Sequence, residues 1–292
     1  MILSYKVTVN DNQKTIKTIL KTEFNMSDRL ILKVKTNQKI ICNKIPVWVN
    51  HIVKEDDLIE VYIDFEETSE NIISANIELN IIYEDEFYLI LNKSAGIPVH
   101  PTAYHYDNTL SNGVKYYFDS IKLDKKIRPV NRLDKDTSGL VVFAKNSYIQ
   151  ECLIKQMKNN IFKKNYIAVL DGILEKENGI IELPISRKQG SIIERCISED
   201  GDYALTNYKI ISKNKNYTIC EVNTQTGRTH QIRVHFQSLG YPLLGDTLYG
   251  RESNLISRQA LHAYRLNFIH PVNKVPVEYT AELPQDMKKL TC

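Results

Sequence analysis

The sequence has no apolar run long enough to cross a membrane. None of its stretches approaches the ~18 uncharged apolar residues of a spanning helix, and its 42% hydrophobic and 25% charged residues are typical of a globular protein. The first residues, Met-Ile-Leu-Ser-Tyr-Lys, also lack the charged start, apolar stretch and cleavage site of a secretory signal peptide. We therefore expect a cytoplasmic protein with no membrane partner.

Cysteine is scarce, and its spacing does not suit disulfides or structural zinc. The five cysteines are at least 24 residues apart, and no Cys-x-x-Cys pair occurs. His230 and His235 form one close pair, but a spacing of five takes them off the single helix face that a His-Glu-x-x-His site needs. We expect no disulfide and no bound metal.

Internal repeats and low-complexity tracts are also absent from the 292 residues, a length that suits one large domain or a large domain plus a small one.

Charge is unevenly distributed along the chain. Lys+Arg minus Asp+Glu is 9 − 3 = +6 for residues 1–50, 1 − 9 = −8 for 51–80 and 28 − 23 = +5 for 81–292. The basic balance of the long C-terminal part allows a polyanionic partner, although a solvated basic face is the commoner cause of such a balance.

Residues 1–75 are predicted to form a small α+β domain of their own. The polar, acidic segment 64–71 predicts a linker, so the boundary between units falls between 70 and 80. The elements expected before it are strands at 30–34, 39–42, 47–49 and 58–63, with a turn at 43–44.

Residues 76–292 are predicted to form a second, larger domain. Ser147 followed by Gln150 is a capping box, which predicts a helix that ends near 159–160. Few long helices separate the predicted strands, so we expect an α+β fold with a mixed, mostly antiparallel sheet and flanking helices. Those strands are 81–83, 87–91, 140–144, 166–170, 203–211, 217–222, 261–268 and 275–281.

The segment 128–145 carries the first candidate chemistry. Polar residues and glycine from Asp134 to Gly139 directly precede a buried strand, and a loop held at a sheet edge often carries reacting groups. A calcium loop is disfavoured because Lys145 occupies the twelfth position, where a bidentate glutamate is needed. Asp-Thr-Ser-Gly at 136–139 is not the aspartic-protease motif, and no second copy exists. A plain polar turn remains an alternative.

The second candidate segment is 223–240. A helix beginning after Thr229 would place His230 and Arg233 together on one face. An arginine fixed there can hold a carboxylate or phosphate through the two hydrogen bonds of its planar fork, although a surface arginine on an amphipathic helix is an equal alternative. The residues that this helix would bury are Ile232, Phe236 and Leu239.

Two further patterns follow from local spacing. The glycines of 240–245 are spaced as in a phosphate loop, but Asp246 stands where that loop requires lysine.

In the third candidate segment, 162–172, Lys164 and Tyr166 point the same way on a predicted strand. The tyrosine therefore either faces a pocket or is a half-buried packing residue.

These three segments, in this order, resemble the RluA family of RNA pseudouridine synthases. Leu261-His-Ala and His270-Pro also resemble the family's C-terminal strand, so the likeness covers roughly 80–285. Asn131 departs from the family, which usually has histidine before the arginine. The matching motifs are Asn131-Arg-Leu-Asp-Lys-Asp-Thr-Ser-Gly139, Lys164-Asn-Tyr-Ile-Ala-Val-Leu-Asp-Gly172 and Thr226-Gly-Arg-Thr-His-Gln-Ile-Arg-Val-His235.

The resemblance implies the pseudouridine-synthase fold and an enzyme that isomerises uridine. Such an enzyme breaks the bond between the base nitrogen and the ribose, turns the base and rejoins it through carbon 5, without a cofactor. The implied partner is structured RNA, large-subunit ribosomal RNA rather than transfer RNA, bound by a monomer. A non-catalytic RNA-binding or ribosome-assembly factor with the same fold is the alternative.

The resemblance also assigns candidate catalytic roles to three residues. Asp134 would be the essential acidic group, which attacks the ribose or abstracts a proton from it. Arg233 would favour the charged form of that carboxylate. Tyr166 would stack on the flipped base and help to remove the proton from carbon 5.

Three more residues, and the N-terminal unit, are assigned to RNA binding by the same resemblance. Arg132 matches the arginine that takes the place of the flipped nucleotide, and Arg228 and His230 are candidates for RNA backbone contacts.

Residues 1–75 resemble the small ribosomal-protein-type RNA-binding module of many family members. If this unit binds RNA, its acidic segment 51–80 must face away from the phosphates. A folded module that does not bind RNA is the alternative.

Overall fold

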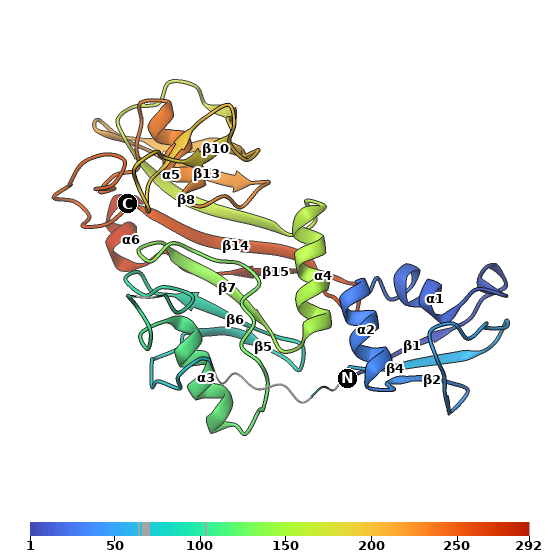
Figure 1. The fold of residues 1–292 in the computed structure, drawn as a ribbon. Coiled ribbons are helices and arrows are strands. Elements are labelled where there is room, and N and C mark those ends of the chain that lie inside the picture. Colours follow the sequence, from blue (N-terminus) through green and yellow to red (C-terminus); the bar gives the residue numbers. More distant parts are fainter. Residues whose placement is uncertain (64, 66–70, 103, 292) are drawn as a thin grey trace.

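The computed structural model describes residues 1–63, 65, 71–102 and 104–291. Figure 1 shows a small N-terminal unit beside a larger unit built on one long sheet, with the N-terminus close to the junction of the two. The predicted linker, 64–71, lies almost entirely outside the described residues. No helix in the described ranges has the length and apolar character to span a membrane.

The N-terminal unit, residues 1–63, is a four-stranded sheet in the order β1-β4-β2-β3 with two helices. Every described strand pair in it is antiparallel. Its elements are β1 (Ile2–Lys6), the 3₁₀ helix η1 (Val9–Asp11), α1 (Ile16–Thr22), α2 (Asp28–Thr36), β2 (Ile40–Cys42), β3 (Ile45–Pro46) and β4 (Leu58–Tyr62).

Two of the strands predicted for this unit are wrong. The segment 30–34 lies inside helix α2, because the Ser27 hydroxyl caps it by accepting from the Leu30 N–H at 3.1 Å. Leu30, Ile31 and Val34 are buried on one side of this helix, so their spacing is helical. The segment 47–49 is not a strand because the chain turns there, with the His51 N–H donating to the Trp48 carbonyl at 3.0 Å.

The larger unit confirms the expected mixed, mostly antiparallel sheet. Eight of its nine strands are joined in the order β5-β6-β7-β14-β8-β13-β12-β9, and the ninth, β15, pairs with β14. Strands β7 and β14 run parallel to each other. The strands are β5 (Ile81–Glu84), β6 (Tyr88–Lys93), β7 (Ser138–Ala144), β8 (Lys163–Asp171), β9 (Asn178–Glu182), β12 (Leu205–Lys213), β13 (Tyr217–Thr224), β14 (Leu261–Ile269) and β15 (Pro276–Thr280). The remaining elements are α3 (Leu110–Ser120), α4 (Ser147–Lys158), the hairpin β10 (Ile185–Arg187) with β11 (Arg195–Ile197), α5 (Gln231–Ser238) and α6 (Gln285–Thr291).

The start of β7 is fixed by a close approach of two backbones. Gly139 has φ +117°, and a Cβ at this position would lie 2.3 Å from the carbonyl oxygen of Ala263 in β14. Only glycine permits this contact without displacement of a strand. The polar turn that precedes β7 is therefore held against the first residues of β14.

Helix α4 begins where predicted, but its cap is a different residue. The side-chain oxygen of Asn146 accepts from the Ile149 N–H at 2.9 Å, so Asn146 is the N-cap. The Ser147 hydroxyl is buried and has no hydrogen-bond partner among the described residues. The predicted capping box is wrong because Ser147 is already the first helical residue.

The cap assignment predicts different costs for two neighbouring substitutions. Asn146→Ala should lower the free energy of unfolding by about 1–2 kcal/mol, because a helix N–H loses its acceptor at a buried site. Ser147→Ala should change it by less than about 0.5 kcal/mol, since its hydroxyl makes no bond to lose. Urea unfolding followed by circular dichroism compares the two variants. Equal costs would contradict the assignment.

Candidate active site

The turn that carries Asp134 is held by hydrogen bonds from two basic side chains. The buried Lys93 ammonium donates to the Lys135 carbonyl at 2.8 Å, and the Arg258 guanidinium donates to the Asp136 carbonyl at 3.0 Å. Burial lowers the pKa of Lys93 to about 7, against the opposing charges of Asp136 and Asp134. Because the two backbone carbonyls that follow Asp134 are both held, its carboxylate is presented from a rigid loop.

The Asp134 carboxylate is half-buried and bound on one side. Its Oδ2 accepts from Arg233 Nη1 at 3.2 Å and lies 3.9 Å from His230 Nε2. No described residue donates a hydrogen bond to Oδ1. One oxygen is therefore held by a fixed positive charge, while the other is available to a bound molecule.

Arg233 is oriented by a residue that sequence reasoning set aside. Its Nε and Nη2 atoms donate to the two oxygens of Asp246 at 2.7 and 2.8 Å, and the Asp246 side chain is fully buried. Burial by itself would lower the pKa of the Arg233 guanidinium, but Asp246 and Asp134 together raise it, so the arginine stays charged. The preceding Gly245 has φ +75°, and a Cβ there would lie 2.4 Å from the Arg258 carbonyl oxygen. The glycine-rich 240–245 segment thus serves to place Asp246.

His230 lies in the same cluster, at the start of α5. Its backbone is left-handed, with φ 59°, which is uncommon for a residue with a side chain. Its Nδ1 is 2.8 Å from the Tyr249 hydroxyl, which also accepts the Arg195 N–H at 2.8 Å. Burial is the main cause that lowers the pKa of His230, and this favours the neutral ring. Tyr249 was not found by sequence reasoning, since nothing in its local pattern marks it.

Tyr166 and Lys164 line one small pocket with Asp134, as their shared strand face predicts. This pocket has a volume of about 80 Å³. Burial, followed by the charge of Asp134, raises the pKa of Tyr166, so its phenol is neutral. Burial lowers the pKa of Lys164 to about 8. The pocket is also lined by Arg132, Arg228, His230 and Arg233.

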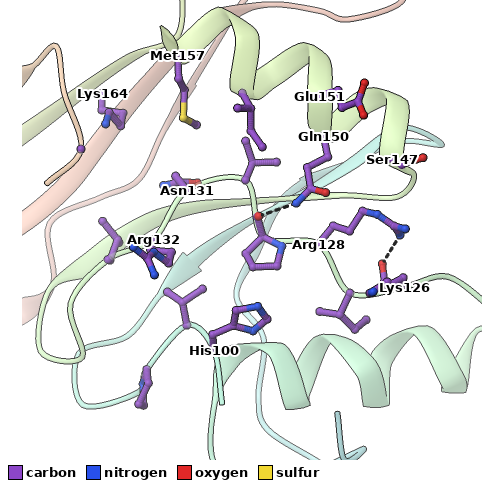
Figure 2. Close-up of a pocket in the computed structure, with 18 of the residues that line it drawn as sticks. His100, Lys126, Arg128, Asn131, Arg132, Ser147, Gln150, Glu151, Met157 and Lys164 are labelled. Carbon is purple, nitrogen blue, oxygen red and sulfur yellow. Dashed lines mark hydrogen bonds between the residues drawn. The ribbon is translucent and has the colours of Figure 1, made fainter. Parts of the chain in front are cut away.

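The small pocket shares several lining residues, Asp134 among them, with a groove of about 1210 Å³. Figure 2 shows Met157, Gln150 and Ser147 of α4 on one side of this groove and His100 on the other, with Asn131 and Arg132 between them. Its lining contains two acidic residues, Asp134 and Glu151, and eight basic ones. The basic residues are Arg29, Lys33, Lys126, Arg128, Arg132, Lys135, Lys164 and Arg228.

The remaining predicted residues differ in how they are held. Arg132 is exposed and lines both the pocket and the groove. Arg228 lines both as well, but it is tied down by Asp202 at 3.3 Å. Asn131 is buried, and its amide donates to the Leu140 carbonyl at 3.0 Å and accepts from the Val142 N–H at 2.9 Å. The asparagine therefore anchors the Asp134 loop to β7.

One group of side chains in the described part of the chain brings three potential metal ligands together. The sulfur of Cys42, a ring nitrogen of His51 and a carboxylate oxygen of Asp57 lie within 4.8 Å of one another in the N-terminal unit. Asp134 lies in the larger unit. Both Asp57 oxygens already accept hydrogen bonds, from the Lys54 N–H and the Asn43 amide, each at 2.7 Å. That the reaction uses no metal stays a prediction.

The chain is similar to proteins that are named as RNA pseudouridine synthases. A sequence profile of the family described as RNA pseudouridylate synthase matches residues 87–238. The uncharacterized RNA pseudouridine synthase YjbO of Bacillus subtilis is 38% identical over 269 residues, covering 92% of this chain and 95% of that protein. Ribosomal large subunit pseudouridine synthase D of Zymomonas mobilis is 40% identical over 230 residues, 74% of this chain and 72% of that protein.

A solved structure resembles the fold of most of this chain. Human RNA pseudouridylate synthase domain containing 1 superposes with a TM-score of 0.60 at 26% identity, covering 72% of this chain and 86% of that one.

The buried pair between Arg233 and Asp246 predicts a large loss of stability when it is broken. Asp246→Ala should lower the free energy of unfolding by about 3–5 kcal/mol, because it leaves a buried guanidinium with a weaker partner. Asp202→Ala, which removes the exposed partner of Arg228, is the matched control and should cost about 0.5 kcal/mol. Urea unfolding of the two variants measures the difference. Similar costs would show that Asp246 does not hold Arg233 in solution.

Proposed function

The chain belongs to the RluA family of RNA pseudouridine synthases, and from this premise we propose that it modifies specific uridines of large-subunit ribosomal RNA, using Asp134 and no cofactor. The enzyme class, an RNA pseudouridine synthase, follows from the family. The observation that carries the proposal is Asp134, held by Arg233 where a small pocket meets a basic groove. The name of the Zymomonas mobilis relative supports ribosomal RNA as the substrate.

The reaction is an isomerisation, so its atoms balance within the nucleotide. The bond between N1 and C1′ breaks, the base turns, a bond forms between C5 and C1′, and the proton of C5 is replaced by one on N1. No electron is gained or lost overall. The proposed absence of a cofactor is consistent with this balance.

Asp134 supplies the group that starts the reaction, by attack on C1′ or by removal of a ribose proton. In both routes the carboxylate is the reacting group, and Arg233 holds its Oδ2 at 3.2 Å in the half-buried site. Both routes also need an oxygen without a competing donor, and Oδ1 has none among the described residues. The arrangement supports Asp134 as the catalytic residue by either route.

The other residues are proposed to accept and hold the flipped nucleotide. The neutral ring of Tyr166 offers a face on which uracil can stack, at ~1–3 kcal/mol per base. Removal of the C5 proton by Tyr166 would need the phenolate, which its raised pKa disfavours, so we assign stacking to it first. Arg132, at the junction of pocket and groove, takes the place of the flipped nucleotide. Arg228 and His230 border the same pocket and contact the RNA.

The proposal also places the protein in the cytoplasm as a monomer, with RNA as its macromolecular partner and residues 1–75 contributing to RNA binding. A non-catalytic ribosome-assembly factor would not need an aspartate held by an arginine beside a small pocket. Asp134, Tyr166 and Arg233 are all present, which favours the enzyme.

Asp134→Asn should reduce pseudouridine formation by about 10³-fold or more, on the scale that loss of an essential catalytic group produces. The amide keeps the shape of the side chain, so folding and RNA affinity should stay near those of the wild type. Pseudouridine mapping of total RNA, from cells that carry the wild-type gene, the variant or no gene, measures the effect and identifies the uridine. Full activity of the variant would refute the assignment.

RNA binding should weaken as pH rises through about 8, because Lys164 loses its charge there. The charged form predominates below this pH and favours phosphate, whereas the neutral form above it does not. Between pH 7 and 9, wild-type affinity for an RNA oligomer should fall about 2–5-fold more than that of Lys164→Arg, whose guanidinium stays protonated. Parallel pH profiles of the two proteins would exclude Lys164 as the titrating group.

A further inference from the structure

The groove that leads to Asp134 has walls from both units of the chain. Arg29, Leu30 and Lys33 of α2 contribute to its lining, together with Gln150, Glu151 and Ile154 of α4. Figure 1 shows α2 of the N-terminal unit alongside α4. The groove is therefore complete only when the N-terminal unit lies where the structure places it.

The N-terminal unit is held on α4 by direct contacts. The Ser27 hydroxyl donates to one oxygen of Glu151 at 2.8 Å, and the Ser27 N–H donates to the other at 3.3 Å. The Lys155 ammonium donates to the Asn25 side-chain oxygen at 2.7 Å. One apolar cluster includes Leu30 of α2 together with Leu153 of α4. These contacts join the two units independently of the connecting segment.

The charges of the groove suit an RNA strand. Of its two acidic residues, Asp134 is paired with Arg233 and Glu151 accepts from Ser27. The exposed Arg29 forms no salt bridge with any described residue. The acidic segment 51–80 contributes no residue to the lining, which is the orientation that RNA binding by the N-terminal unit requires.

The size of the groove favours a strand over a small molecule. Its 1210 Å³ exceed the ~300–1,000 Å³ of pockets for small ligands. It is continuous with the pocket at Asp134 through Arg132, Lys164 and Gly227, which line both. A molecule that fills it therefore runs from the reacting base to the N-terminal unit.

We propose that the N-terminal unit is a fixed wall of the substrate groove and not a mobile RNA handle. Single-stranded RNA next to the target uridine lies along α4, and Arg29 contacts its phosphates. This inference rests on the proposed function, because the strand is the one that carries the modified uridine. Substrates whose flanking segment cannot enter this groove as a single strand are excluded by shape.

Arg29 is tested in the full-length protein with a labelled 20-nucleotide oligouridylate, by fluorescence anisotropy at several salt concentrations. Arg29→Ala should raise the Kd about 3–10-fold and reduce the slope of log Kd against log salt by about 0.7, the value for one contact to a single strand. Lys35→Ala removes the same charge from an exposed position of α2 outside the lining. It should leave both quantities unchanged. Equal behaviour of the two variants would overturn the contact.

The fixed position is tested by cutting the connection between the units. A protease site inserted at residues 66–70 of the full-length chain allows cleavage after folding. The two fragments should co-elute in gel filtration, and the Kd for the oligouridylate should change less than twofold. Separation of the fragments would show a tethered handle and overturn the proposal.

Neither readout depends on catalysis, so the outcomes are distinguishable from a failure of the proposed function. Full activity of Asp134→Asn would refute the catalytic assignment and leave the Arg29 and cleavage results standing. Normal pseudouridine formation together with an ineffective Arg29→Ala would overturn the Arg29 contact, and normal pseudouridine formation with separated fragments would overturn the fixed wall.

Discussion

One buried guanidinium organises the site. Arg233 uses two of its nitrogens to hold Asp246 and a third to hold Asp134, so that a single side chain links the buried Asp246 to the carboxylate of Asp134. Asp246 is fully buried and supplies the charge that keeps Arg233 in place. The geometry of the fork leaves Asp134 with one bound oxygen and one available oxygen. The planar side chain of arginine is needed here, because lysine could not make these contacts with fixed directions.

The sheet provides the rigidity that this arrangement needs. The loop of Asp134 is joined to β7, which lies against β14 so closely that position 139 must be glycine. Lys93 and Arg258, from distant parts of the chain, hold the two carbonyls that follow Asp134. Asn131 pairs with the backbone of β7. The asparagine that departs from the family pattern thus keeps the loop in position by its two amide hydrogen bonds.

The proposed function separates the choice of substrate from catalysis. The pocket at Asp134 is small, whereas the groove is larger, basic and bordered by both units. Phosphate contacts fix the position of a nucleic acid without reading its sequence. Under the proposed function, a groove bordered by both units would select RNA by whether a strand of the right shape can reach Asp134.

Local pattern determined much of this protein from the sequence alone. The larger unit with its mostly antiparallel sheet, the strand of Tyr166, the helix of Arg233 and the loop of Asp134 all follow from periodicity and turn residues, which act over a few neighbours. The same reasoning mistook 30–34 for a strand and Ser147 for a cap. In these cases the side chain that decides the structure, Ser27 or Asn146, lies just before the segment that was considered.

Tertiary structure alone decided which distant residues meet. Asp246 follows a segment that fails as a phosphate loop, and Tyr249 has no local signature, yet they contact Arg233 and His230, the two residues beside Asp134, because the chain returns there after α5. The position of α2 along the groove also has no signal in the sequence. Contacts between residues far apart in the chain depend on how sheets and helices pack, and a local pattern holds no information on that packing.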